Sequence, residues 1–260
     1  MALLEVNQVR RTFGGVVAVD QVTFQVQPGH IKSVIGPNGA GKTTLFNMIS
    51  GVLKPESGGI FFKGQTITGW APHQIARIGV SRTFQNPSLF LKMNVLENVM
   101  VGRHRRSRWG FTACSLRLPS QLKEEKAIRA AALAQIEDLG LASLVDVPAG
   151  ALAFGQRRMV ELARALATEP ELLLLDEPAS GLNTKEKEDL GRLIVNIRDR
   201  GITVVLVEHD VSMVMEISNE ILVMHNGTVL AEGLPAVIQN NPRVISVYLG
   251  GEFQHAAASQ

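Results

Sequence analysis

The sequence predicts an α/β fold in which buried strands alternate with helices, together with an N-terminal antiparallel β part and an inserted helical segment. Three observations predict this fold. Short apolar runs at residues 31–35, 172–175 and 202–207 are typical of strands that are covered on both faces. Apolar and polar residues alternate over residues 3–35, as in half-buried strands. Helical periodicity dominates residues 92–168.

The composition narrows the class of protein. A chain of 260 residues can bury a sizeable core, and 45% hydrophobic with 19% charged residues is typical of a globular protein. A formal charge of +2 is too small to indicate a nucleic-acid partner. The single cysteine, Cys114, cannot form an internal disulfide, so a reducing cytosol is expected. Residues 1–5 lack the features of a secretory signal, and aliphatic runs such as Val204–Val207 are far shorter than the ~20 residues that span a bilayer.

The N-terminal part is predicted to consist of antiparallel strands joined by turns. Apolar residues alternate from Leu4 to Val9 and again from Val22 to Val26. Gly14-Gly15 and Pro28-Gly29 supply turn signals. Phe13 lies beside the first turn. An aromatic at a strand end is more often a core residue than a stacking surface, and the residues alone leave both interpretations open.

One segment fits the P-loop pattern G-x-x-x-x-G-K-[ST], namely Gly36-Pro37-Asn38-Gly39-Ala40-Gly41-Lys42-Thr43-Thr44. It follows the predicted strand 31–35 and precedes a helical pattern that stops at Gly51. Glycines let several backbone N–H groups point at one anion, and the helix N-terminus adds partial positive charge. We therefore expect Lys42 to reach the β- and γ-phosphates of a nucleotide and the Thr43 hydroxyl to ligate Mg²⁺. A Gly-rich turn before an ordinary helix is the weaker alternative.

The segment after the P-loop helix is predicted to continue the core. Residues 58–64 read as a strand, and Ala71-Pro72 opens a short helix through Ile78, because the missing N–H of proline is not needed in a first helical turn. Pro87 then disfavours helix just before it. Taken alone, Gln85 in this stretch is simply a polar residue at a strand end.

Two amphipathic helices are predicted within the helical segment. One ends at Gly140 and the other before Pro170. Their apolar stripes are, respectively, Ile128, Ala132, Ile136 and Leu139, and Met159, Val160, Ala163, Leu166 and Ala167. Residues 103–109 concentrate positive charge beside a tryptophan. A solvated loop is favoured there over a patch for phosphate or lipid headgroups.

Strands and helices alternate again after the helical segment. The run 172–175 is followed by a helix whose N-cap is predicted to be Asn183 or Thr184. The next strand leads into Glu208-His209-Asp210. Asn226-Gly227 between two apolar runs predicts a β-hairpin over residues 221–232. The residues after Phe253 are expected to lack structure.

Acidic residues follow one of the buried strands. Asp176 and Glu177 lie just beyond its carboxyl end, where α/β sheets place ligand groups. A Mg·nucleotide site needs a carboxylate near the metal and benefits from a group that orients water. Asp176 is the candidate for the metal and Glu177 the candidate for the water. His209, after the next strand, is either a structural residue or one that reaches the γ-phosphate.

In their order along the chain these elements resemble the ATP-binding subunit of ABC transporters. The resemblance covers nearly the whole chain. It identifies Gln85 as the Q-loop glutamine and a metal ligand beside Thr43 and Asp176, His209 as the switch histidine and Phe13 as the adenine-stacking aromatic. The signature is matched by Leu152-Ala153-Phe154-Gly155-Gln156 and the D-loop by Ser180-Gly181-Leu182-Asn183. The implied catalytic set is Glu177, His209, Gln85 and Lys42, with ATP and Mg²⁺ as cofactors.

The resemblance also implies an assembly and a domain organisation. Each ATP would lie between the P-loop of one subunit and the signature of a second ATPase subunit, in a homo- or heterodimer. A single ABC ATPase domain would span residues 1–260. Within it, residues 1–91 and 169–252 would form a RecA-like core with a β subdomain, residues 92–168 the helical signature subdomain, and residues 253–260 a disordered tail. Integral membrane permease subunits, and indirectly a solute-binding protein, would be the partners at the cytoplasmic face of the bacterial inner membrane.

Three positions depart from the family's motifs: two lie in the signature, which in the family is close to Leu-Ser-Gly-Gly-Gln, and one lies in the D-loop. Ala153 replaces the signature serine, and Phe154 replaces a glycine and adds bulk at the subunit interface. Asn183 replaces the aspartate that is usual in the D-loop. Loss of one hydrogen bond to a charged phosphate weakens ATP-driven closure by about 1.5–3 kcal/mol unless backbone N–H groups compensate.

These departures and the C-terminal sequence resemble the larger ATPase of branched-chain amino acid importers. The matching features are Leu-Ala-Phe-Gly-Gln-Arg-Arg, the insert near residues 104–120, and the ending from Ala231 to Gly250. Importers of urea or short amides and a lipopolysaccharide-type exporter are the alternatives. A soluble ABC protein of DNA repair or translation would need a coiled-coil insertion or a second cassette, and neither is present. A GTPase would need a guanine-reading Asn/Thr-Lys-x-Asp motif, and a kinase would not need the signature.

Overall fold

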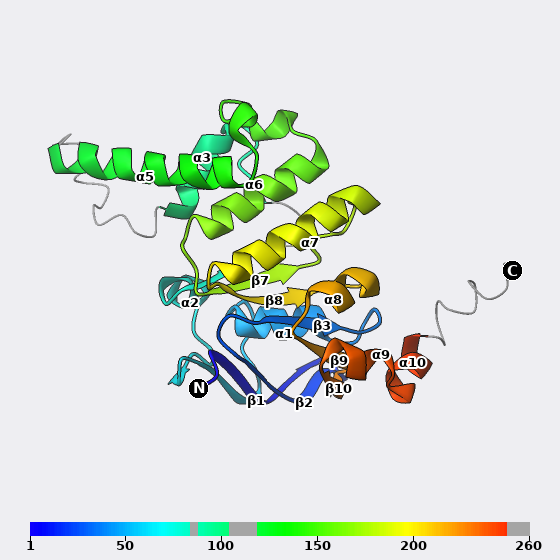
Figure 1. Cartoon of the computed structure of the whole chain (residues 1–260). Helices are drawn as coiled ribbons and strands as arrows, with labels where there is room; N and C mark the ends of the chain where they lie inside the picture. The colour runs from blue at the N-terminus through cyan, green and yellow to red at the C-terminus, as the bar shows by residue number, and fades with distance from the viewer. Residues whose placement is uncertain (84–87, 104–118, 249–260) are drawn as a thin grey trace, which may run out of the picture.

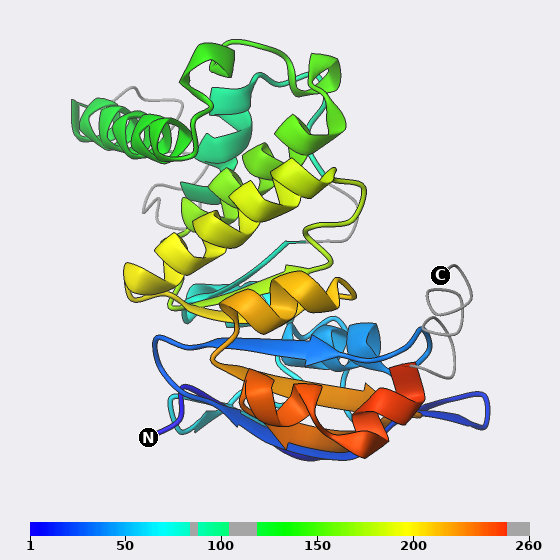
Figure 2. The same cartoon turned by 45° about the vertical axis from the view of Figure 1, so that its right-hand side comes forward.

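The computed structural model describes residues 1–83, 88–103 and 119–248, and the side chains of these residues except 119–124. Figures 1 and 2 show the chain as a helical part stacked on a sheet-containing core, with the antiparallel β part at the opposite end. Gln85, the basic residues 104–108, Cys114 and the tail 253–260 lie outside the described residues.

The first sheet is antiparallel, as predicted. Its strands follow the order β2-β1-β4-β5, with bounds β1 Leu4–Phe13, β2 Val16–Val26, β4 Ser57–Phe62 and β5 Gln65–Thr66. Leu4 pairs with Val26 on one side and with Phe62 on the other. The alternation of apolar residues therefore directs one face of this sheet into the core.

The second sheet has the order β10-β9-β3-β8-β7-β6. Its strands are β3 Ile31–Ile35, β6 Val80–Arg82, β7 Leu172–Asp176, β8 Thr203–Val207, β9 Glu220–His225 and β10 Thr228–Gly233. Strands β9, β3, β8, β7 and β6 are parallel, whereas β9 and β10 form the predicted hairpin around Asn226-Gly227. The helices of this part are α1 Lys42–Ile49, α2 Pro72–Arg77, α7 Thr184–Asp199, α8 Val211–Ile217, α9 Pro235–Gln239 and α10 Pro242–Tyr248.

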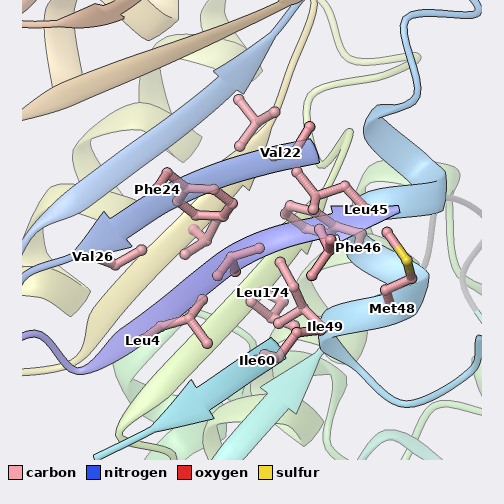
Figure 3. Close-up of a cluster of buried hydrophobic side chains, with 14 of the residues drawn as sticks. Leu4, Val22, Phe24, Val26, Leu45, Phe46, Met48, Ile49, Ile60 and Leu174 are labelled. Atoms are coloured by element: carbon pink, nitrogen blue, oxygen red, sulfur yellow. The ribbon is translucent and has the colours of Figure 1, made fainter. Parts of the chain in front are cut away.

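Both faces of this second sheet are buried, which explains its continuous apolar runs. Val205 and Val207 of β8 pack with α1 and the antiparallel sheet, whereas Val204 and Leu206 pack with α7 and α8. Figure 3 shows Leu45, Phe46, Met48 and Ile49 of α1 packed among side chains of the antiparallel sheet and Leu174 of β7. Because α1 lies between the two sheets, its N-terminal end is held rigidly, and this end carries the P-loop.

The helical part has a core of its own. It contains α3 Val95–Arg103, α5 Pro119–Asp138, the short 3-10 turns η2 Ala142–Leu144 and η3 Ala149–Ala151, and α6 Phe154–Leu166. Val99, Ile136 and Val160 are among the residues of this core with no exposed surface. Within the described ranges, no helix combines the length and the apolar character needed to cross a bilayer.

Several local predictions are confirmed. The α2 helix begins at Pro72 and ends with Ile78 as its C-cap. Asn183 is the N-cap of α7, where its side chain accepts a hydrogen bond from the N–H of Glu186. The signature helix α6 begins at Phe154, because Ala153 has the extended backbone of an N-cap.

Candidate nucleotide-binding site

The P-loop is a backbone structure that requires glycine at two positions. Gly36 and Gly41 have φ angles of 153° and 99°. A Cβ at Gly36 would lie 2.2 Å from the carbonyl oxygen of Met224, and one at Gly41 would lie 2.2 Å from that of Ala18. The loop is thus wedged between β9 and β2, and any side chain at these glycines would displace it.

Lys42 begins α1 and lies under the loop. Its Nζ donates hydrogen bonds to the carbonyl oxygens of Gly36 (2.6 Å) and Pro37 (3.0 Å). Burial lowers the pKa of Lys42, while the charges of Glu177 and Asp176 oppose this shift. The lysine that the motif assigns to phosphate binding therefore lies within electrostatic reach of the two predicted acids.

The register of the parallel sheet brings the predicted site residues to one edge. Val207 at the end of β8 is paired with Val34 of β3 on one side and with Asp176 of β7 on the other. The carboxyl ends of these three strands lead into the P-loop, Glu208-His209 and Asp176-Glu177. This edge is where ligands bind in open α/β sheets.

Asp176 is buried and ion-paired. Nη2 of Arg82 donates to its Oδ2 at 2.7 Å, and the two side chains are 8% and 4% exposed. Nη1 of Arg82 also donates to Asn47 of α1 and to Ser50, the C-cap of this helix, each at 2.7 Å. Arg82 therefore joins β6, β7 and α1 beneath the site. The sequence did not single it out, since a three-residue strand carries no signal that its last side chain turns inward.

Glu177 has a left-handed backbone, with φ 47°. This conformation is uncommon for a residue with a side chain, and such strain concentrates at functional sites. The N–H of Glu177 donates to the carbonyl of Val207 at 2.9 Å, and its own carbonyl accepts from the N–H of Ser180. The backbone of this turn is therefore held against the end of β8 at the sheet edge.

The carboxylate of Glu208 has no exposed surface and lies next to this turn. It accepts hydrogen bonds from the N–H of Ala179 (2.7 Å) and from the N–H of His209 (3.1 Å). Burial raises the pKa of Glu208, and these backbone donors act in the opposite direction. The sequence signal for Glu208 was available, because it is a carboxylate directly after a buried strand, as Asp176 is.

The predicted D-loop contacts the predicted signature within the same chain. Gly181 has φ 79°, and a Cβ there would lie 3.0 Å from the ring of Phe154. The guanidinium of Arg158 lies 5.3 Å from the centre of that ring. Phe154 thus packs against its own D-loop and still exposes 45% of its surface.

Backbone capping orders the start of the signature helix. Oε1 of Gln156 accepts from the N–H of Ala153, and Arg157 donates to the carbonyls of Leu152 and Gly150. Leu152 is buried in the core of the helical part. The first residue of α6 and its N-cap Ala153 are exposed, and a helix N-terminus of this kind attracts anions.

Phe13 is a predicted site residue whose side chain is partly exposed. Phe13 ends β1, is 43% exposed, and has the Arg11 guanidinium 5.1 Å from its ring centre. One ring face is therefore covered by a cation, and its exposure shows that Phe13 is not a core residue; its stacking role stays a prediction. The structure brings together the P-loop, Lys42, Asp176, Glu177 and the His209 segment; Gln85 lies outside the described residues.

Comparison with known proteins gives two family matches. The family described as ABC transporter matches residues 19–180, and the family described as branched-chain amino acid ATP-binding cassette transporter matches residues 228–254. The chain is similar to the high-affinity branched-chain amino acid transport ATP-binding proteins BraF of Pseudomonas aeruginosa and LivG of Escherichia coli. Each is 44% identical over 249 residues, which cover 95% of this chain and 98% of the relative.

Solved structures agree with this. The ADP conformation of an ATP-binding cassette of an ABC transporter is 33% identical to this chain and superposes with a TM-score of 0.84. The match covers 96% of this chain and 99% of the solved one. A nucleotide-free cassette has 31% identity and a TM-score of 0.83, covering 95% and 99%. The predicted P-loop fold with antiparallel and helical parts is therefore confirmed. The chain belongs to the ATP-binding proteins of ABC transporters, in the group of branched-chain amino acid transport.

Proposed function

We propose that this chain is the ATP-hydrolysing subunit that powers an importer of branched-chain amino acids. The observation that carries the proposal is the edge of the parallel sheet, where buried Lys42 lies within electrostatic reach of Asp176 and Glu177. A lysine for phosphate, an acid for the metal shell and an acid for water are the groups that ATP hydrolysis needs.

Each side chain at this edge has a distinct task. When nucleotide binds, Lys42 replaces its hydrogen bonds to the carbonyls of Gly36 and Pro37 with hydrogen bonds to the β- and γ-phosphates. The negative charge of these phosphates then offsets the desolvation cost of the buried ammonium. Glu177 orients and deprotonates the attacking water, and His209 contacts the γ-phosphate. The hydrogen bond from the N–H of Glu177 to the carbonyl of Val207 holds the backbone of the turn, which favours a preorganised position for Glu177.

The donor set fits Mg²⁺. The Thr43 hydroxyl, the Asp176 carboxylate and Gln85 offer the oxygen ligands that Mg²⁺ prefers, with nucleotide phosphates completing its coordination. Bound Mg²⁺ neutralises charge that develops on the phosphates. Within the described residues, no three His, Cys, Asp or Glu side chains cluster as a self-sufficient metal site.

The site is completed by a second ATPase subunit. The N-terminus of α6, with residues 152–156, meets the nucleotide held by the partner's P-loop, and the D-loop residues 180–183 lie beside that junction. Ala153 offers no hydroxyl to the phosphate, so the backbone N–H groups of the first turn of α6 act in its place. Phe154, packed on Gly181, keeps the signature and the D-loop of one chain in a fixed relation.

The exposed apolar loop at residues 89–93 is the proposed contact surface for a permease subunit. Phe90, Leu91 and Met93 are 50%, 53% and 37% exposed, whereas Leu89 packs on the helical core. Buried Asn98 fixes this loop by exchanging hydrogen bonds with the backbone of Phe90 in both directions. The carbonyls of Leu91 and Met93 accept from the N–H groups of Gly150 and Ala149, just before the signature. A helix of a membrane subunit seated on this loop would therefore act on the signature.

The relatives support the proposed solute, and the proposed location rests on the transport role. Proteins 44% identical over almost their whole length are described as high-affinity branched-chain amino acid transport proteins. We therefore assign the chain to the cytoplasmic face of the bacterial inner membrane, bound to permease subunits that receive solute from a binding protein. Import of urea or amides and lipopolysaccharide-type export are the alternatives.

Co-purification from membranes tests the proposal. The chain should bring down permease subunits, and vesicles containing the purified complex should take up labelled leucine when Mg·ATP is supplied on the side of the ATPase. The same complex with Lys42→Ala should assemble but not transport. Uptake of urea in place of leucine, or ATP-driven loss of a lipid substrate, would replace the assigned solute.

A further inference from the structure

The buried carboxylate of Glu208 connects two loops of the site. One oxygen accepts from the N–H of Ala179, in the loop that begins with Glu177, and the other accepts from the N–H of His209. Ala179 and Glu208 are 29 residues apart in the chain, so this connection is tertiary. A side chain with no exposed surface leaves neither oxygen to water.

The loop that Glu208 contacts begins with Glu177, whose backbone is left-handed. The left-handed Glu177 turn is anchored at its start by the carbonyl of Val207 and two residues later by Glu208. Val207 and Glu208 are consecutive, so the end of β8 fixes the turn at two points. The second oxygen fixes the backbone of His209, whose imidazole Nδ1 lies 3.7 Å from the same carboxylate.

We propose that Glu208 is a positioning residue for ATP hydrolysis. Its carboxylate holds the backbone of the Glu177 loop and the backbone of His209 at fixed positions relative to each other at the sheet edge. The inference rests on the roles proposed above for these two residues. Because its side chain has no exposed surface, Glu208 is not placed to bind nucleotide, so its loss should lower turnover with little effect on ATP binding. An uncharged side chain that accepts only one hydrogen bond should retain part of the effect.

Steady-state ATPase kinetics of the full-length protein test this. For Glu208→Ala we expect kcat to fall about tenfold or more, with KM and Mg·ATP affinity changed less than about threefold. Glu208→Gln keeps one acceptor oxygen, so its kcat should lie between that of Glu208→Ala and that of the wild type. Thr203→Val is the matched control, because Thr203 is a buried side chain at the other end of β8 that also accepts a backbone N–H, from Gly29 at 2.9 Å. It should lower thermal stability and keep the wild-type kcat.

A double-mutant cycle separates positioning from general weakening. Glu208→Gln should reduce kcat less in a His209→Ala background than in the wild type, because part of its effect acts through His209. This comparison remains available if Glu208→Ala does not fold. A wild-type kcat in both Glu208 variants, equal reductions in the two backgrounds, or a change in KM alone would overturn the inference.

Glu177→Gln, measured in the same series, separates this inference from the proposed function. If it is inactive while the Glu208 variants turn over at the wild-type rate, the inference alone fails. If Glu177→Gln itself hydrolyses ATP at the wild-type rate, the assignment of the site fails, and the inference fails with it.

Discussion

Removing the charge of Arg82 should strongly destabilise the fold. The Arg82–Asp176 pair is almost completely buried, with side chains 8% and 4% exposed, so water does not screen the charge that remains. Arg82→Met keeps apolar contact with the ring of Phe46, which lies 5.8 Å from the guanidinium, but leaves the Asp176 carboxylate unpaired. Breaking a buried pair in this way costs about 3–5 kcal/mol, a large share of the roughly 5–15 kcal/mol that stabilises a typical protein.

Urea unfolding of the nucleotide-free protein measures this effect. Arg192→Met is the control, because the Arg192–Asp189 pair is exposed and its loss should barely change the unfolding free energy. The double variant Arg82→Met/Asp176→Asn removes both charges and should be more stable than Arg82→Met alone. The reasoning is refuted if Arg82→Met is as stable as Arg192→Met, or if neutralising Asp176 as well destabilises the protein further.

Three further perturbations address the site and its surroundings. Lys42→Ala should weaken Mg·ATP binding about tenfold or more by equilibrium dialysis, since charged hydrogen bonds to phosphate are lost, and unchanged affinity would contradict the P-loop assignment. Glu177→Gln should bind ATP with wild-type affinity and nearly abolish phosphate release, so rapid turnover would remove Glu177 from its role. The hydrogen bond from Lys187 lowers the pKa of Asp210 below its ordinary 3.8, so the stability from this charge is present above that value and is lost as the pH falls through the lowered pKa. In urea unfolding, the difference in unfolding free energy between wild type and Asp210→Asn should therefore shrink on acidification. A difference that grows would show that the assumed direction of the pKa shift is wrong.

The parts of the site that follow from backbone geometry were predictable from sequence. Gly36 and Gly41 are required in the P-loop because backbone carbonyl groups leave no room for a Cβ at either position. The sequence shows this requirement as a glycine spacing between a strand and a helix. Asp176 and Glu177 were predictable because a carboxylate pair directly follows a fully buried strand. The Asn183 cap and the Asn226-Gly227 hairpin depend on short-range rules and are also confirmed.

The parts that depend on distant contacts were not predictable. Arg82 contacts Asn47, 35 residues away, and Asp176, 94 residues away, and no local pattern encodes either distance. Phe154 was recognised as a departure from the family pattern, but the sequence did not indicate that its ring packs on Gly181 of the same chain. The catalytic and binding roles of the candidate site residues, Gln85 and Phe13 among them, remain predictions.

ATP-driven association of Glu177→Gln tests the central claim most directly. Sedimentation velocity with and without Mg·ATP measures whether the bound triphosphate joins two copies of the chain, with Lys42→Ala in the same background as the nucleotide-binding control. We predict a monomer without nucleotide, a dimer with one ATP retained per chain when Mg·ATP is present, and no dimer for the double variant. A Glu177→Gln protein that stays monomeric at saturating Mg·ATP, or that retains no ATP, would contradict the account.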